Sequence, residues 1–171
     1  MTQVFDETGK LHGVTVLEAG PCPITQIKTG DKDGYTALQI SFGKKKREIR
    51  LPSVADYQLG QELKVDMFKP GDVVRVSGLS IGKGFAGNVK RFHTHRGPMS
   101  HGSKSHRIPG SSGSGTTPGR VFRGRKMPGR LGGGMVTSKS LTVIQVIPDK
   151  NLILLRGAVP GKSGNLIVIR K

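Results

Sequence analysis

Histidine, serine, lysine and arginine are concentrated in one stretch, residues 82–135. It holds four of the five histidines and 11 lysines or arginines. Histidines one residue apart could bind zinc, and a serine beside a histidine could act as a nucleophile. Residues 73–148 contain no Asp, Glu or Cys, so no carboxylate or thiol is available to complete a zinc site or to orient a catalytic histidine. We therefore predict no catalytic residue, no metal site and no cofactor, and expect that the chain is not an enzyme.

A glycine motif in the same stretch could indicate a dinucleotide-binding turn. Residues 82–87 read GKGFAG, which matches the GxGxxG pattern of dinucleotide-binding turns. That turn needs a following helix and an acidic residue about 20 positions on to hold the ribose. Here the sequence NVKRFHTHRGP follows, and no acid lies in the window. We therefore favour the interpretation that these glycines allow the backbone to approach a sugar-phosphate chain closely.

The net charge of +17 is unevenly distributed along the 171 residues. Residues 73–148 carry 13 basic and no acidic residues, whereas the rest carries 15 basic and 11 acidic residues. Such asymmetry points to nucleic acid or an anionic membrane, the alternative being a merely solvated face. Because the basic stretch lacks an amphipathic helical period and a long apolar run, nucleic acid is favoured.

The composition of residues 82–135 suits a polyphosphate partner. With 14 glycines and few large apolar residues, the stretch is expected to be disordered alone and ordered on nucleic acid. Arginine grips phosphate through two hydrogen bonds or stacks on bases, and lysine acts as a point charge. Phe85, Phe92 and Phe122 either stack on bases or form a local core, and both readings stay open.

The remaining residues predict an antiparallel all-β body. Short segments rich in Val, Ile, Thr and Tyr alternate with Gly, Asp and Pro, and no long helical period is present. About eight strands with tight turns suggest a small closed β-barrel. Residues 1–81 and 136–171 would form this body, and residues 82–135 a long basic, glycine-rich extended arm inserted between strands, with its two ends close in space. The expected strands cover residues 13–20, 24–29, 35–42, 63–68, 72–80, 136–148, 152–161 and 165–171.

Two shorter features have alternative readings. Residues 43–50, GKKKREIR, fit either a solvated hairpin end or a phosphate contact. Cys22 lies between two prolines and has no second thiol, so it favours a structural role in a reducing compartment. The opening MTQVFDETGK contains neither a signal core nor a transit-peptide pattern.

Several long runs resemble a known family. IGKGFAGNVKR, RGPMSHGSKSHRIPGS, GTTPGRVFRGRKMPGRLGG and NLILLRGAVPGKSGNLIVI are similar to the third protein of the large ribosomal subunit, in its bacterial and plastid form. The opening MTQVFDETG and the run GPCPITQIKTGDKDGYTALQI also resemble it, so nearly the whole chain is covered.

The resemblance implies a translation-protein type β-barrel with an arm that runs through large-subunit rRNA toward the peptidyl transferase centre. It implies a structural role, early subunit assembly, and large-subunit rRNA and neighbouring ribosomal proteins as partners. It implies neither a membrane nor a small-molecule substrate. The rRNA-binding residues implied by position are Lys83, Phe85, Lys90, Arg91, Arg96, His101, Lys104, His106, Arg107, Arg120, Arg123, Arg125, Lys126 and Arg130.

The chain also departs from the family pattern. Members carry a longer segment after the strand equivalent to residues 35–42, whereas GKKK here leads almost directly into REIRLPSVADYQLGQ. The sequences RGPMSHGSKSHR and GTTPGR are most similar to those of cyanobacterial and plastid members. The resemblance therefore implies a ribosome in the chloroplast stroma, with the bacterial cytoplasm as the alternative.

Overall fold

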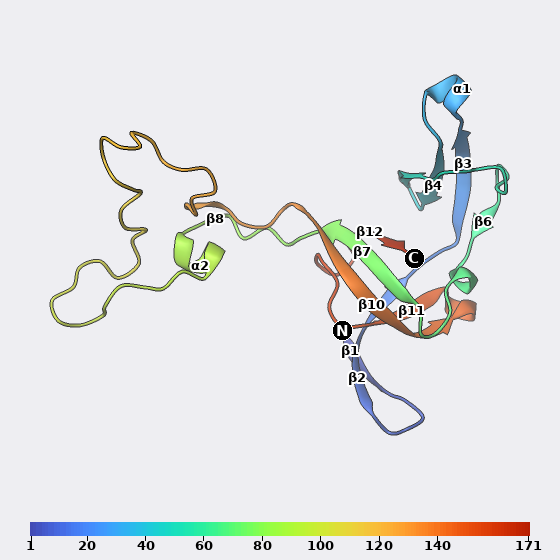
Figure 1. The fold of residues 1–171 in the computed structure, drawn as a ribbon. Coiled ribbons are helices and arrows are strands. Elements are labelled where there is room, and N and C mark those ends of the chain that lie inside the picture. Colours follow the sequence, from blue (N-terminus) through green and yellow to red (C-terminus); the bar gives the residue numbers. More distant parts are fainter. The chain divides into compact units, whose positions relative to one another are not determined.

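The computed structural model describes residues 1–171 and is built mostly of β-strands (Figure 1). The strands are β1 (Thr2–Phe5), β2 (Leu11–Glu18), β3 (Cys22–Lys28), β4 (Ala37–Phe42), β5 (Lys45–Arg50), β6 (Glu62–Leu63), β7 (Val73–Leu79), β8 (Phe85–Ala86), β9 (Gly129–Arg130), β10 (Met135–Ile147), β11 (Leu152–Arg156) and β12 (Ile167–Arg170). The helices are α1 (Gly30–Asp33), α2 (Asn88–Phe92) and the 3-10 turns η1 (Val65–Met67) and η2 (Pro148–Lys150). The predicted all-β class is confirmed. Every helix is too short to cross a membrane.

The chain divides into two compact units. Unit 1 comprises Met1–Ser77, Thr137–Val159 and Val168–Lys171, and unit 2 comprises Gly78–Val136 and Pro160–Ile167. The predicted body and extension had different bounds, with their borders at residues 81/82 and 135/136. The assignment of structural and rRNA-binding roles to these two parts stays a prediction.

Most strand residues belong to unit 1 and form two sheets. One sheet has the strand order β1-β2-β11-β10-β7-β12, and the other has the order β5-β4-β3-β6. Neighbouring strands with described registers are antiparallel, including β2 with β11 and β3 with β4 (Figure 1). The predicted hairpin at residues 149–151 is confirmed, because η2 joins β10 to β11 there.

The predicted closed barrel is not found. Both sheets are open, because closure requires hydrogen bonds between the first and last strands of a sheet, and none of the pairings closes a ring. In the smaller sheet the edge strand β5 carries Lys45, Lys46, Arg47 and Arg50. Charged side chains on an edge strand disfavour further strand pairing, which is consistent with an open edge.

The apolar core of unit 1 follows from strand periodicity. In β7 the residues Val74 and Val76 are buried and Val73 and Arg75 are exposed, as the alternation predicted. The central strand β11 contributes three consecutive buried residues, Ile153–Leu155. Consecutive burial shows that β11 is covered on both faces, and this strand therefore anchors the core.

One predicted strand is largely wrong. Residues 63–68 were expected to be a strand, but only Glu62–Leu63 pair, as β6, and Val65–Met67 form η1. The amide of Phe68 donates to the carbonyl of Val65 at 2.9 Å, which closes the turn. Val65 is 1% exposed, so burial of this side chain outweighs the local strand propensity.

The basic run at residues 43–50 forms a hairpin. Phe42 pairs with Lys45, so Gly43 and Lys44 are a two-residue loop between β4 and β5. Gly43 has φ 56°, a value that glycine adopts without strain, and such loops favour glycine. The hairpin reading is therefore confirmed, whereas a phosphate contact by these lysines stays a prediction.

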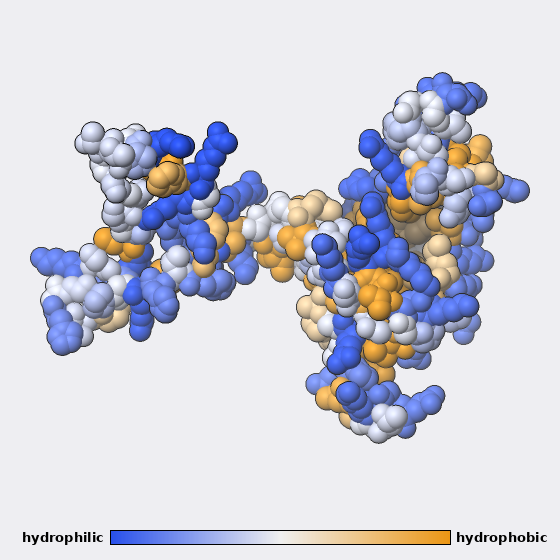
Figure 2. Space-filling model, viewed as in Figure 1, coloured by the Kyte–Doolittle hydropathy of each residue, from blue (hydrophilic) through white to orange (hydrophobic).

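Unit 2 contains little regular structure. Its elements are the β8–β9 pair, the helix α2 and the adjoining ends of β7, β10 and β12 (Figure 1). Between α2 and β9 the chain has no helix or strand and forms irregular coil with short turns and bends. Figure 2 shows hydrophilic and neutral residues over most of the visible face of this unit, with small hydrophobic groups between them. Ala86 and Asn88 are the buried side chains of residues 82–135.

Candidate nucleic-acid interface

Backbone hydrogen bonds join the two ends of the basic segment. The amide of Ser80 donates to the carbonyl of Gly134 at 2.9 Å, and the amide of Lys83 donates to that of Leu131 at 2.9 Å. The predicted proximity of the segment's ends is therefore confirmed. At this base Gly132 has φ 70°, and a Cβ there would overlap the carbonyl oxygen of Ile81. Only glycine fits this backbone without strain.

The next layer is the β8–β9 pair with α2. Phe85 lies opposite Arg130 in the strand pair and is 79% exposed. The Arg91 guanidinium donates from Nη1 to the carbonyl of Met127 at 2.7 Å and lies 4.9 Å from the Phe92 ring centroid. Lys126 Nζ lies 5.9 Å from the same ring. Two cations on one ring form a small cation–π cluster, so Phe92 belongs to a local cluster within the protein.

The glycine motif leads into this layer and not into a nucleotide-binding helix. Phe85 and Ala86 of the GKGFAG run form β8, and α2 that follows has only five residues. A dinucleotide-binding turn requires a long helix whose N-terminus carries the pyrophosphate. The geometry therefore agrees with the sequence argument against a dinucleotide site.

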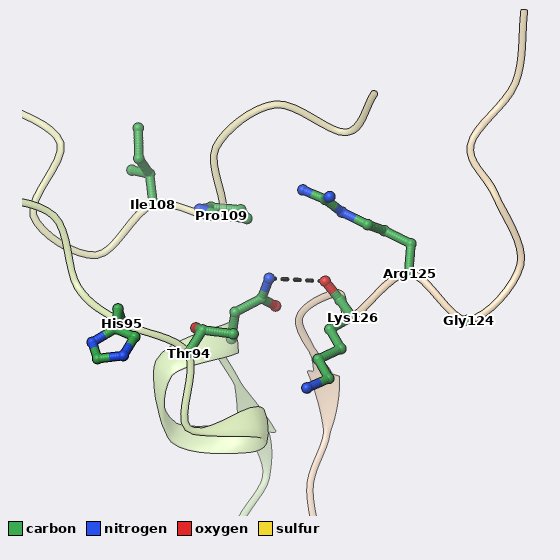
Figure 3. A pocket seen from close by; sticks show the side chains of 8 residues that line it. Thr94, His95, Ile108, Pro109, Gly124, Arg125 and Lys126 are labelled. Carbon is green, nitrogen blue, oxygen red and sulfur yellow. Dashed lines mark hydrogen bonds between the residues drawn. The ribbon is translucent and has the colours of Figure 1, made fainter. Parts of the chain in front are cut away.

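A cavity opens between α2 and the returning chain. It has a volume of about 380 Å³ and its lining includes His95, Ile108, Pro109, Arg125 and Lys126 (Figure 3). Thr94, Gly124 and Asn88 complete the lining. Asn88 is 6% exposed, and its Nδ2 donates to the Lys126 carbonyl at 2.9 Å. Its Oδ1 is buried and has no hydrogen-bond partner.

Residues 97–106 form a closed loop. The amide of Gly97 donates to the carbonyl of His106 at 2.9 Å, and His106 Nδ1 lies 2.9 Å from the carbonyl oxygen of Pro98. A Cβ at Gly97 would overlap the Ser105 carbonyl oxygen. His101 lies at the turn of the loop with φ 57°. One ring nitrogen of His106 thus holds the loop, and the other remains available to a partner.

Arginines also organise the returning chain. The Arg120 guanidinium carbon lies 5.7 Å from the Phe122 ring centroid. Arg125 donates from Nη2 to the carbonyl of Ser111. Each guanidinium has five N–H donors. A single internal contact therefore leaves most of the hydrogen-bonding capacity of Arg125 free for another ligand.

The 14 predicted rRNA-binding residues all lie in unit 2. Twelve of them are exposed, and Arg91 and His106 are half-buried. Arg91, Lys126 and Phe92 come together, and Arg125 and Lys126 share the cavity with His95. Of the 14, only Arg91, His106 and Arg125 make a side-chain hydrogen bond within the chain. The polar side chains without one are those of Lys83, Lys90, Arg96, His101, Lys104, Arg107, Arg120, Arg123, Lys126 and Arg130. The 14 residues are therefore spread over the surface of unit 2 and do not form one compact site. No set of three metal-ligating side chains assembles anywhere in the structure.

The electrostatics of this surface differ from those of an ordinary protein face. All four ion pairs of the structure, at Asp6, Glu48, Glu62 and Asp72, belong to unit 1. Unit 2 contains no carboxylate side chain at all. Its cations repel one another without internal neutralisation, and an external polyanion would lower that repulsion.

Sequence reasoning missed the cavity. From the sequence, Asn88 is an ordinary polar residue at the start of a short helix. The sequence does not predict that its side chain is buried. Thr94, Ile108 and Pro109 also lacked a signal, and His95 was not among the predicted rRNA-binding residues. Their convergence depends on contacts across about 38 residues of chain, such as the bond from Asn88 to Lys126.

Comparisons with known proteins agree with these features. The sequence model of the family "Ribosomal protein L3" matches residues 50–151. The chain is 53% identical to the large ribosomal subunit protein uL3 of Gloeothece citriformis, over 99% of this chain and 91% of the relative. It is 52% identical to uL3 of Thermosynechococcus vestitus, with the same shares of both chains covered. The chain belongs to the ribosomal protein L3 family, which is a family of ribosomal proteins and not of enzymes.

The alignment also bears on the predicted missing segment. The match to the Gloeothece protein runs over 193 aligned positions, more than the 171 residues of this chain. The relative therefore carries residues with no counterpart here. The predicted place of the difference, after the strand equivalent to residues 35–42, corresponds to the two-residue loop between β4 and β5.

Proposed function

We propose that this chain is a structural constituent of the large ribosomal subunit and binds large-subunit rRNA through residues 82–135. The observation that carries the proposal is the exposed, carboxylate-free basic surface of unit 2 in a chain of this family. The relatives named above are large ribosomal subunit proteins, which supports the same assembly for this chain.

Binding would combine charge neutralisation with close backbone approach. Arginines grip phosphates through paired N–H groups, and glycines leave room for the sugar-phosphate chain. Each phosphate neutralised releases counterions, so the affinity falls as salt rises. The residues assigned to rRNA contacts are Lys83, Phe85, Lys90, Arg91, Arg96, His101, Lys104, His106, Arg107, Arg120, Arg123, Arg125, Lys126 and Arg130.

The finer role follows from the family resemblance. Residues 82–135 act as an extended arm that reaches toward the peptidyl transferase centre and helps to nucleate early subunit assembly. Its partners are large-subunit rRNA and neighbouring large-subunit proteins. The arm supplies positioning and charge, and the chemistry of peptide transfer belongs to the RNA.

The site of action is the ribosome, in the chloroplast stroma. The cyanobacterial relatives support a plastid or cyanobacterial lineage, and the bacterial cytoplasm is the alternative. Fractionation of the source cell into plastids and cytoplasm would separate the two. Recovery of the chain with cytoplasmic ribosomes alone would contradict the plastid assignment.

Charge reversal tests the assignment of rRNA binding to residues 82–135. Arg123→Glu with Arg125→Glu should strongly reduce co-sedimentation of the chain with large subunits, because both cations would become anions facing phosphate. The matched control is Lys10→Glu with Lys150→Glu, the same charge change at exposed turns of unit 1. Lys171 is less suitable because it pairs with Asp72 at 2.7 Å. Equal losses in both variants would contradict the proposed division of roles.

Crosslinking in cells tests the assembly itself. Peptides from residues 82–135 should crosslink to large-subunit rRNA near the peptidyl transferase centre. Crosslinks scattered over many RNAs, with the protein in the free pool, would instead indicate an RNA-binding factor outside the finished subunit.

A further inference from the structure

The buried carboxamide of Asn88 has one satisfied and one unsatisfied end. Its Nδ2 donates to the Lys126 carbonyl at 2.9 Å, so exchange of the amide nitrogen and oxygen would place two acceptors against each other. The orientation is therefore fixed, and Oδ1 is the atom without a partner. A buried polar atom that lacks a partner costs about 1–3 kcal/mol, which favours a donor from outside the chain.

The cavity next to Asn88 combines three kinds of surface. Ile108 and Pro109 supply apolar wall, Arg125 supplies N–H donors and positive charge, and Asn88 supplies the acceptor (Figure 3). The Lys126 ammonium points away from Arg125 and lies 5.9 Å from the Phe92 ring. Its volume of about 380 Å³ falls within the range of about 300–1,000 Å³ of small-molecule sites. A matching ligand needs a flat apolar face, an anionic group and an N–H donor.

Simpler ligands satisfy only part of this lining. A metal cation would suit Asn88 Oδ1 but would be repelled by Arg125 and Lys126. A free phosphate would suit Arg125, and its P–OH group could donate to Oδ1, but it would leave the apolar wall without a partner. A nucleotide brings all three groups, since every base has a planar face and at least one N–H, and its phosphate follows at a short distance.

We propose that this cavity is a binding pocket for a single unstacked nucleotide of RNA. The base lies against Ile108 and Pro109 and donates an N–H to Asn88 Oδ1, and its phosphate lies against Arg125. Unstacked bases are the usual target of sequence-specific RNA recognition, because their Watson–Crick edges are free. This inference rests on the proposed function and adds a base-reading site to a surface otherwise built for phosphate.

The test is chemical probing of rRNA in assembled large subunits that contain the full chain. Dimethyl sulfate and a carbodiimide together modify the Watson–Crick edges of all four bases. Asn88→Leu removes the acceptor, and Ile108→Ala removes apolar wall at a side chain that is 63% exposed and so hardly supports folding. Val121→Ala, at an exposed residue of the same segment outside the cavity lining, is the matched control.

The expected result is one nucleotide that is protected in wild-type subunits and exposed in both cavity variants. Loss of one hydrogen bond should raise its reactivity about threefold to tenfold in Asn88→Leu, while Val121→Ala leaves it unchanged. Normal incorporation with no nucleotide exposed in either variant would overturn the pocket and leave the proposed function intact. Broad changes in Asn88→Leu alone would also overturn it, because they indicate a structural role for Asn88. Absence of wild-type chain from the subunits would overturn the proposed function itself.

Discussion

Units 1 and 2 are stabilised by different interactions. Eleven of the twelve buried apolar side chains belong to unit 1, and Ala86 is the one in unit 2. Unit 2 is organised instead by backbone hydrogen bonds, glycine turns and arginines bound to carbonyl oxygens, as in Arg91 with Met127. Apolar burial supplies most of the free energy of folding, so unit 1 should be stable alone and unit 2 should depend on its partner.

Charge follows the same division. Unit 1 pairs four of its 11 acids with neighbouring bases, as in Glu48 with Lys28 at 2.9 Å, whereas unit 2 has no acid to pair. A surface that repels itself is costly in a free protein and useful in a complex with a polyanion. The contrast shows two roles in one chain: unit 1 folds around its own apolar core, and unit 2 presents a charged surface that a polyanionic partner would neutralise.

The largest expected change in the free energy of unfolding comes from a substitution in the core of unit 1. Leu155 is 0% exposed in the central strand β11, and Leu155→Ala should lower the free energy of unfolding by about 2–5 kcal/mol. Chemical denaturation followed by far-ultraviolet circular dichroism measures this change.

Phe122→Ala is the control from unit 2. This side chain is larger but 64% exposed, and its removal should change unfolding by less than about 0.5 kcal/mol. Similar losses from both substitutions would show that the two units share one source of stability, and the contrast between them would fail.

A smaller effect is expected from backbone strain at the base of unit 2. In Gly132→Ala the new Cβ would overlap the Ile81 carbonyl oxygen, and φ 70° would cost roughly 1–2 kcal/mol. Affinity for large-subunit rRNA should therefore fall about 5- to 30-fold, as measured by filter binding at fixed salt. Unfolding of unit 1 should be unchanged.

Gly134→Ala provides the comparison for this experiment. Gly134 has no atom within 4 Å of an added Cβ and no left-handed backbone, so this variant should bind rRNA like the wild type. Wild-type affinity in Gly132→Ala would mean that the base of the segment rearranges without cost, and that its hydrogen-bonded geometry is unimportant for binding.

The elements that could be predicted from sequence are those fixed by local pattern. The alternation in β7 identified its buried face, and the residues around Asp149 identified a hairpin. Val65 was misplaced because its burial in a 3-10 turn depends on distant packing. Barrel closure was also wrong, because it depends on which edges meet, and the order of strands along the chain leaves that open.

The candidate site shows the same limit. Composition alone marked residues 82–135 as an acid-free basic stretch. The individual rRNA-binding residues came from the family resemblance and stay a prediction. Asn88 was missed because its role arises from burial against the carbonyl of Lys126, far along the chain. Disorder of residues 82–135 in the free chain stays a prediction, for which amide hydrogen exchange with and without rRNA is the measurement.

The smallest expected effect concerns acid and sharpens the contrast in charge. The Lys28 ammonium, followed by the Tyr35 hydroxyl, lowers the pKa of Glu48 below its ordinary value of 4.5. The folded state then binds this proton less readily than the unfolded state, so the contribution of Glu48 is present above pH 4.5 and lost as pH falls through the lowered pKa. Glu48→Gln should therefore reduce the loss of unit 1 stability between about pH 5 and about pH 2, measured by denaturant unfolding at each pH.

The acid-induced loss of stability in Glu48→Gln should become smaller and not vanish, because the pKa values of Asp6 and Asp72 are lowered too, chiefly by hydrogen bonds from Thr8 and Lys171. An unchanged acid dependence in Glu48→Gln would show that the exposed cluster with Lys28 contributes nothing to stability, and that paired charge is not part of what distinguishes unit 1 from unit 2.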